Sequence, residues 1–287
     1  MTILRPARAK CHRTFALALL PALVFTARSA AAVDPFEIQV YDGTANSPGS
    51  PGLELHVNRV FSGLTTAPPP ELPQNGQSHF TLEPSLGITN FWELGGYFET
   101  TVRADGTFDY AGVKLRSKFV TPPDWHPNLR FGVNFEVSLL PTAYDRDQWG
   151  MEIRPIATWE NDLWLFVINP IVDASLAGPD YRAGPTFEPA AMAKVKIAGT
   201  VAVGLEYYAD LGPIAGILPL SQEEHYLFEA ADLLSVKNFE LNVGLGEGLT
   251  PASNAFVGKM ILGYTWEREA AKGPPPPQTQ ARMAYRK

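Results

Sequence analysis

The feature of this sequence that most constrains its fold is a series of long runs in which apolar and polar residues alternate. In the run 128–140 the alternate apolar positions hold Leu129, Phe131, Val133, Phe135, Val137 and Leu139. Successive side chains of a β-strand point to opposite faces, so such a run predicts a strand with one apolar face. Many runs reach the roughly 9 to 11 residues that a tilted strand needs to cross a bilayer, whereas soluble strands average about five or six. The pattern predicts an all-β protein and favours membrane-spanning strands.

Twelve runs of this kind follow one another, and their connections tend to alternate between short and long. Short periplasmic turns and long outer loops are typical of a bacterial outer-membrane barrel. Two connections fit poorly, because 104–107 is short for an outer loop and 121–127 is long for a turn. We therefore predict a transmembrane antiparallel up-and-down β-barrel of about 12 strands over residues 52–266. The runs span 52–62, 79–88, 92–103, 108–120, 128–140, 148–159, 163–173, 187–198, 201–211, 225–235, 239–247 and 255–266.

Residues 1–32 have the layout of a secretory signal peptide, with basic residues, then an apolar stretch, then small residues up to Ala32. The apolar stretch is too short to span a membrane, and Cys11, the only cysteine, precedes it. Cleavage after Ala32 removes five basic residues and leaves 18 against 30 acidic ones, a net charge of about −12. This acidic balance argues against a nucleic-acid partner. The leader and the strands together predict location in the bacterial outer membrane.

The predicted barrel is flanked by a segment before it, 33–51, and one after it, 267–287. Residues 33–51 contain one more alternating stretch, but a thirteenth strand would place the two ends of the barrel on opposite sides of the membrane. We interpret this segment as a periplasmic lead-in or a plug inside the barrel, and both alternatives remain open. Residues 267–287 are polar and proline-rich, which predicts a disordered periplasmic tail.

Aromatic residues lie near the ends of several runs, where aromatic girdles meet the two membrane interfaces. The last run, FVGKMILGYTW, ends in such a residue and resembles the C-terminal strand that barrel proteins present to their assembly machinery. We therefore expect the barrel assembly machinery to bind through residues 255–266, although Trp266 does not end the chain. The girdle residues are Trp92, Trp149, Trp159, Trp164, Tyr264 and Trp266.

The stretch NVGLGEGL superficially resembles a nucleotide-binding glycine loop. Its spacing is G-x-G-x-G, whereas the dinucleotide fingerprint is G-x-G-x-x-G at the start of a helix. Gly244 and Gly246 fall on the polar face of an alternating run, which predicts structural glycines facing a crowded barrel interior. Gly248 approaches an outer loop. No cofactor is predicted.

Charged residues fall on the polar, inward face of several runs. On 108–120 this face is expected to hold Tyr110, Gly112, Lys114, Arg116 and Lys118. One interpretation is a ladder of ion pairs that fills and hydrates the lumen, and the other is a basic wall that attracts anionic solutes. Across the lumen we expect an acidic wall of Glu206, Asp210, Glu240 and Glu247. The neighbouring runs contribute Glu99, Arg103, Arg130, Glu136, Glu152, Arg154 and Glu160.

The histidines of the predicted mature chain are the residues on which an enzymatic function would depend. A phospholipase-like barrel needs serine and histidine on the outward face, whereas His79 shares the inward face with Thr81 and Ser85. An omptin-like protease needs paired acids and a histidine on outer loops. Asp145 and Asp147 lie in one expected outer loop and His225 borders another, but carboxylates in a surface loop are usually just solvated. No cluster has metal-ligand spacing. We therefore expect no enzymatic activity, no catalytic residues and no metal.

Several stretches carry a resemblance to a known group, among them TLEPSLGITNFWELGGYFET, DYAGVKLRSKFV and WGMEIRPIATWENDLWLFVINPIVD. The chain resembles the transporter-like outer-membrane barrels of Gram-negative bacteria, some of them grouped with the MetA-pathway phenol-degradation family. The resemblance covers roughly residues 34–266 and implies an outer-membrane barrel, with no site residue to carry over. We expect a channel or transporter for an unknown small solute, in contact with outer-membrane lipid. A filled structural or anchoring barrel is the alternative, and an outer-membrane hydrolase is a third.

Overall fold

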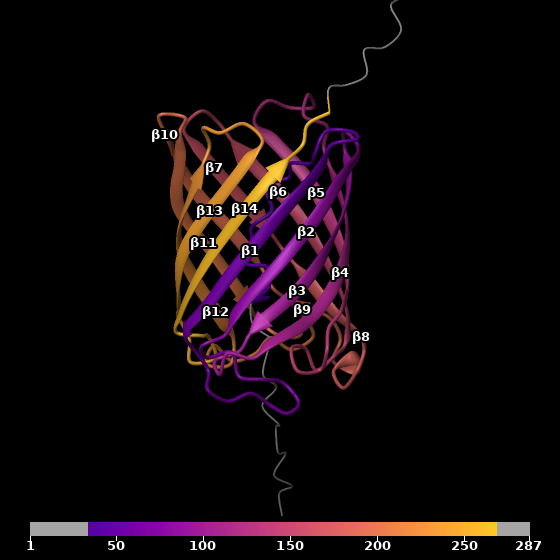
Figure 1. The fold of residues 1–287 in the computed structure, drawn as a ribbon, viewed down its shortest axis with the longest axis vertical. Helices are drawn as coiled ribbons and strands as arrows, with labels where there is room; N and C mark the ends of the chain where they lie inside the picture. Colours follow the sequence, from indigo (N-terminus) through magenta and orange to yellow (C-terminus); the bar gives the residue numbers. More distant parts are fainter. Residues whose placement is uncertain (1–33, 269–287) are drawn as a thin grey trace, which may run out of the picture.

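Backbone pairing of the first strand with the last closes the sheet into a barrel (Figure 1). The computed structural model describes residues 34–268, so the predicted signal peptide and most of the predicted tail lie outside the described residues. No helix among residues 34–268 has the length and apolar character needed to cross a membrane. The strands are β1 (Pro51–Ser62), β2 (Ser78–Thr89), β3 (Trp92–Val102), β4 (Phe108–Val120), β5 (Leu129–Leu139), β6 (Trp149–Glu160), β7 (Trp164–Asn169), β8 (Val172–Ala177), β9 (Thr186–Phe187), β10 (Ala190–Ile197), β11 (Val201–Asp210), β12 (Glu224–Leu233), β13 (Phe239–Gly248) and β14 (Phe256–Thr265).

These fourteen segments make a closed barrel of twelve antiparallel strands, which confirms the predicted fold class. β7 and β8 both pair with β6 and form one strand that is interrupted at Pro170. β9 and β10 form another strand, interrupted at Pro189. Proline cannot donate to the ladder of backbone hydrogen bonds, which explains why both breaks contain one.

The two ends of the barrel differ in the length of their connections. At the turn end lie the connections 90–91, 121–128, 161–163, 198–200 and 234–238, together with the start of β1 and the end of β14. At the loop end lie 63–77, 103–107, 140–148, 178–185, 211–223 and 249–255. The connection 103–107 is short for the loop end and the connection 121–128 is long for the turn end, as the sequence indicated. Successive connections still alternate between the two ends of the barrel.

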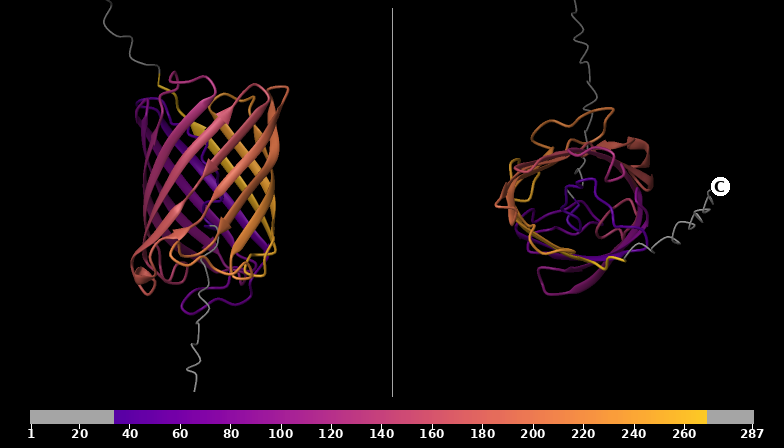
Figure 2. Two further views of the ribbon diagram at one scale, coloured as in Figure 1. Left: turned by 180° about the vertical axis from the view of Figure 1, so that it is seen from behind. Right: turned by 90° about the horizontal axis from the view of Figure 1, so that it is seen from above.

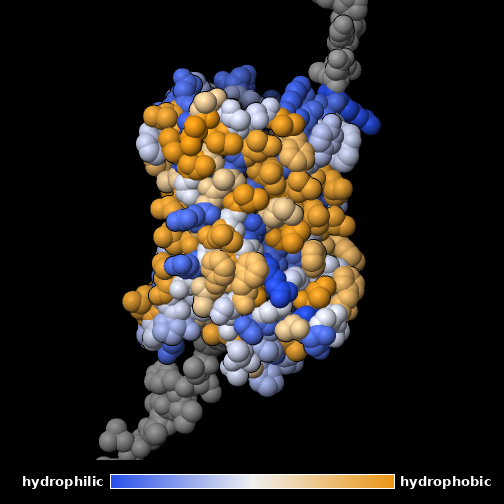
Figure 3. Space-filling model, turned by 60° about the vertical axis from the view of Figure 1, so that its left-hand side comes forward, coloured by the Kyte–Doolittle hydropathy of each residue, from blue (hydrophilic) through white to orange (hydrophobic). Residues whose placement is uncertain are grey.

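The outward face of the barrel is largely apolar, with leucine, phenylalanine and valine exposed along most strands (Figure 3). Glu229, at the middle of β12, is a charged exception. Trp92 is half-buried and stacks on Phe119 at the turn end. The other residues assigned to the girdles are exposed on the outward face near strand ends: Trp149, Trp159, Trp164, Tyr264 and Trp266.

Residues 34–50 lie inside the barrel (Figure 2). We call this segment the lumen segment. It begins near the loop end, where the ring of Phe36 contacts Tyr144, and it reaches the turn end, where Gly49 N donates to Gly87 O over 2.7 Å. Ile38 and Val40 pack in a buried cluster with side chains of β1, β7, β10 and β12. The segment therefore crosses the lumen from one end to the other.

Two residues expected to face the lumen, Tyr110 and Glu247, point outward instead. The pairing of β3 with β4 shifts register between Glu99 and Thr100, and Gly112 in the bulge has a φ of 147°. The extra residue reverses the alternation, so Tyr110 is 47% exposed on the outward face and Ala111 is buried inside. Glu247 also points outward, because it shares a face with Val243 and Leu245 rather than with Glu240.

Candidate functional site

The three cations predicted on β4 do face the lumen, and each is matched by a carboxylate. Arg116 Nη2 lies 2.5 Å from Glu83 Oε1, and its Nη1 lies 2.8 Å from Glu93 Oε1. Lys118 Nζ lies 2.9 Å from the same Glu93 oxygen. Lys114 pairs with Asp34 of the lumen segment and lies 3.7 Å from Glu99. The basic strand is therefore electrically compensated.

A second group of contacts centres on Tyr41 of the lumen segment. Its ring lies 4.5 Å from the Arg154 guanidinium carbon, a cation–π contact. Its hydroxyl is 2.5 Å from that of Tyr97, which in turn donates to Glu136 Oε1 over 3.1 Å. Arg154 also contacts Glu152 at 2.7 Å and Glu37 at 3.5 Å. Aromatic and charged groups thus bind the lumen segment to the strands.

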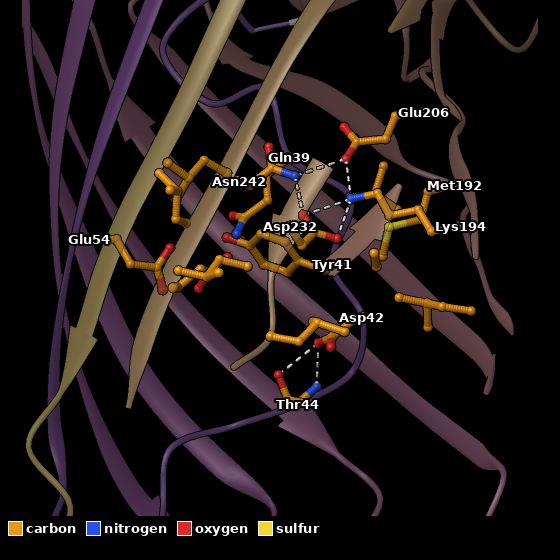
Figure 4. Close-up of a pocket in the computed structure, with 18 of the residues that line it drawn as sticks. Gln39, Tyr41, Asp42, Thr44, Glu54, Met192, Lys194, Glu206, Asp232 and Asn242 are labelled. Carbon is orange, nitrogen blue, oxygen red and sulfur yellow. Dashed lines mark hydrogen bonds and ion pairs between the residues drawn. The ribbon is translucent and has the colours of Figure 1, made fainter. Parts of the chain in front are cut away.

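A third group of contacts lies on the strands of the opposite wall. Lys194 Nζ lies 2.7 Å from Glu206 Oε1 and 2.7 Å from Asp232 Oδ2 (Figure 4). Lys259 pairs with the other oxygen of Glu206 and donates to Ile38 O over 3.0 Å. Asn242 Nδ2 donates to Asp232 over 2.5 Å. The two contacts of Glu206 are buried, so they are screened by water much less than surface pairs, whereas Asp232 is partly exposed.

Between the lumen segment and this wall lies a cavity of about 370 Å³ (Figure 4). Its lining mixes charged groups with apolar ones, so it can accept a small solute that carries charge. The charged side chains that line it are Asp42, Glu54, Glu83, Arg116, Lys118, Glu160, Lys194, Lys196, Glu206, Asp232, Glu240 and Lys259.

Some of the sequence-predicted lumen residues contact each other and others do not. The predicted neighbours Lys114 and Glu99 lie together, as do Arg154 and Glu152. Arg130 pairs with Glu160 at 2.5 Å, whereas Arg103 pairs with Asp109 at the loop end. Glu136 accepts hydrogen bonds from Tyr97 and Asn134, although its backbone is paired with Arg116. Asp210 accepts from Gly212 N, and Glu240 lines the cavity.

Sequence reasoning missed several partners of the lumen cations. Glu83, Glu93 and Lys259 stand on the inward faces of recognised runs, so the alternation itself could have identified them. The alternation also places Glu54 beside His56, and the backbone register then brings Glu83 opposite Glu54. Asp34 and Glu37 carry no such signal, because the lumen segment is not a strand.

The acidic loop 140–148, at the loop end, contains a carboxyl group with an altered acidity. Burial, together with the negative charges of Asp147 and Glu71, raises the pKa of Asp145 to about 6. Burial also raises the pKa of Glu71 on the neighbouring loop. Protonation of Asp145 near pH 6 would make this end of the barrel less negative.

The glycines of β13 face the lumen and make close contacts, as predicted. A Cβ added at Gly246 would lie 2.5 Å from the ring of Phe228, and one at Gly244 would lie 3.2 Å from Lys259 Cε. These two positions are glycines because large inward side chains of the adjacent strands occupy the space.

The histidines considered for catalysis have other partners. His79 Nε2 is 3.1 Å from Gln77 Oε1, and its ring packs edge-on against Phe36. Thr81 and Ser85 bond to the lumen segment, at Phe36 O and Asn46. His225 lies between Tyr207 and Glu223, with distances of 2.6 and 2.8 Å. Within residues 34–268 the ring nitrogens of these two histidines bond to Gln77, Tyr207 and Glu223, and not to a serine or threonine hydroxyl.

No protein-family model matches this sequence, and no curated protein matches it. Among solved structures, the chain is similar to the COG4313 outer membrane channel from Pseudomonas putida F1. The TM-score is 0.54 at 13% identity, and the match covers 80% of this chain and 100% of that chain. The chain is also similar to the KdgM porin, with a TM-score of 0.50 at 9% identity over 75% and 99% of the two chains. These similarities show that the fold is that of outer-membrane β-barrels.

Proposed function

We propose that this protein is an outer-membrane channel or transporter for small charged solutes, with its turn end in the periplasm. The supporting observation is a closed barrel with an apolar exterior and a charged interior that contains a cavity of about 370 Å³. Short turns and both ends of the barrel on one side are the usual periplasmic arrangement. Two outer-membrane channels with a similar fold are consistent with this function. We also propose, from the sequence resemblance, membership of the transporter-like group.

The lumen segment must move before a solute can pass. It contributes Asp34 to Lys114, Glu37 to Arg154 and Asp42 to Arg130. When it leaves, these three cations lose carboxylate partners and the lumen becomes more basic. With the lumen segment in place, carboxylates compensate the basic wall. Without the segment, the same wall attracts anions, as expected from the sequence, so the two descriptions are two states of one pore.

The test is single-channel conductance in planar bilayers, comparing residues 33–287 with a variant that lacks residues 34–47. We expect small or rare steps from the first protein and larger, anion-preferring steps from the second. Since the deletion removes buried side chains, a second variant, Asp34→Asn with Glu37→Gln, keeps the segment and only weakens its attachment. Neutralising Lys114, Arg116 and Lys118 in the open variant should reduce the anion preference.

Silence from all of these variants, each shown to be folded, would refute the channel and support the filled anchoring barrel. A hydrolase is disfavoured, because the hydroxyl groups near His79 are bonded to the lumen segment. Thr81 donates a hydrogen bond to Phe36 O, and Ser85 accepts one from Asn46. We propose a protein without enzymatic activity.

A further inference from the structure

Three side chains of the kinds that bind metals converge in the lumen. Glu54 and His56 share the inward face of β1, and Glu83 lies inward on β2, where the register pairs it directly with Glu54. Two carboxylates directly opposite each other on neighbouring strands are destabilising. A positive charge between them would remove this repulsion.

The spacing of the three groups fits a tetrahedral ion. His56 Nε2 lies 3.2 Å from Glu83 Oε2 and 3.5 Å from Glu54 Oε2, and all three atoms lie within 4.8 Å of one another. Zinc bonds of about 2.0–2.2 Å to imidazole and carboxylate place neighbouring ligands roughly 3.3–3.6 Å apart. Both distances from the imidazole are close to this range. The two carboxylate oxygens lie within 4.8 Å of each other, and Glu54, the more exposed of the two side chains, has room to adjust.

The hydrogen bonding of the group is incomplete in a way that an ion would correct. Glu54 Oε2 is buried and has no hydrogen-bond partner among residues 34–268. His56 is fully buried, and its Nε2 can offer at most one proton to the two carboxylates. A buried polar atom without a partner costs about 1–3 kcal/mol. A cation between the three atoms would satisfy both carboxylates at once.

The surroundings resemble those of an open metal site. Arg116 Nε donates to Glu83 Oε1 over 2.6 Å, which orients that carboxylate and leaves Oε2 for a metal. Glu54 and Glu83 both line the 370 Å³ cavity, so a fourth position could be taken by water or solute. His56 Nδ1 is buried without a hydrogen-bond partner in the described part of the chain. Since such a partner typically strengthens binding about 10–100-fold, this site should be weaker than closed zinc sites.

We propose that Glu54, His56 and Glu83 form a binding site for a divalent transition metal of the Zn²⁺ type in the lumen wall. An imidazole ligand favours Zn²⁺ over Mg²⁺ and Ca²⁺, which prefer sets of oxygen ligands alone. The site is independent of the proposed channel, because it needs only the closed barrel.

The test is titration of the refolded mature barrel, without a polyhistidine tag, with Co²⁺ followed by visible absorption and with Zn²⁺ followed by calorimetry. We expect one ion per barrel with the intense absorption of four-coordinate Co²⁺. His56→Ala and Glu54→Gln should each weaken binding by more than about 100-fold, since even outer-shell changes cost about 10–100-fold. His79→Ala is the matched control, because His79 is buried in the same lumen but bonds to Gln77.

Folding of every variant is checked by heat-dependent electrophoretic mobility. Glu54→Gln keeps the size of the side chain, so it remains informative if His56→Ala does not fold. The proposal is overturned if the folded protein binds no ion, or if Glu54→Gln and the parent protein bind equally well. In either case His56 serves as the positive partner of the two carboxylates by itself.

Discussion

Glu206 and Glu160 are carboxylates that each bridge two cations, and they differ mainly in burial. Glu206 joins Lys194 and Lys259 and has a side chain that is 2% exposed. Glu160 joins Arg130 and Lys196 and is 26% exposed. Replacing each carboxylate with glutamine removes one charge and keeps the shape. Comparing the two glutamine variants therefore measures how strongly water screens the charges at these two positions of the lumen.

The expected cost of Glu206→Gln follows from the partners that remain. Lys194 keeps Asp232 at 2.7 Å, so it still has a carboxylate. Lys259 keeps only neutral acceptors, namely Ile38 O at 3.0 Å and Tyr208 Oη at 3.1 Å. Removing one partner of a buried ion pair costs about 3–5 kcal/mol. Because Lys194 remains paired, we expect a loss of about 3 kcal/mol.

Glu160→Gln should cost about 1 kcal/mol or less, since water screens partly exposed pairs. The assay is equilibrium urea unfolding in phospholipid vesicles, followed by tryptophan fluorescence. Adding Lys259→Met to Glu206→Gln removes the unpaired cation and should restore most of the lost free energy of unfolding. Equal losses in the two glutamine variants would refute the reasoning, because they would mean that water reaches Glu206 as freely as Glu160.

Three further predictions concern other parts of the barrel. Gly246→Ala should lower the free energy of unfolding by about 1–3 kcal/mol, because its Cβ meets Phe228 at 2.5 Å, and adding Phe228→Leu should recover much of this loss. Glu229→Leu should raise it in vesicles by about 1–2 kcal/mol, because a charge on the outward face at mid-strand is unfavourable in lipid. Asp145 has a pKa near 6, above its ordinary value of 3.8, so the folded protein binds the proton more tightly. Its contribution to stability should therefore grow as the pH falls from about 6 to 4, and urea midpoints measured against pH should show less of this change in Asp145→Asn.

The barrel could be predicted from the sequence because the signal for it is local. A period of two residues places Glu136 and Leu139 on opposite faces without knowledge of the neighbouring strands. The same reasoning failed at Tyr110, where a bulge adds one residue and reverses the alternation. The sequence reasoning also missed the interruptions at Pro170 and Pro189. Each of these strands keeps its place in the barrel, but its series of backbone hydrogen bonds is broken at the proline.

The pairing of the lumen charges was harder to predict, because it depends on register and on tilt. Arg116 lies opposite Glu136 in the backbone register, yet its side chain contacts Glu83, two strands away in the other direction. Long side chains reach across a narrow lumen, so neighbours in the sheet need not be partners. Asp34 and Glu37 belong to the lumen segment, which lies outside the sheet. No periodic pattern in the sequence indicates where that segment lies, so their contacts could not be predicted.

The lumen segment and the charged wall form one electrostatic unit, and this limits how the barrel can open. The segment supplies acceptors to cations on four different strands, three of them through backbone oxygens at 3.0–3.2 Å. Withdrawing it removes these acceptors, although each cation keeps a carboxylate of the barrel wall, namely Glu99, Glu160, Glu152 or Glu206. Water or an anion must then occupy the vacated donor positions, because a buried donor without a partner costs about 1–3 kcal/mol. An open state must therefore be hydrated, which favours charged solutes over hydrophobic ones. The contacts concerned are Lys114 with Asp34, Arg130 with the backbone oxygen of Asp42, Arg154 with that of Gln39, and Lys259 with that of Ile38.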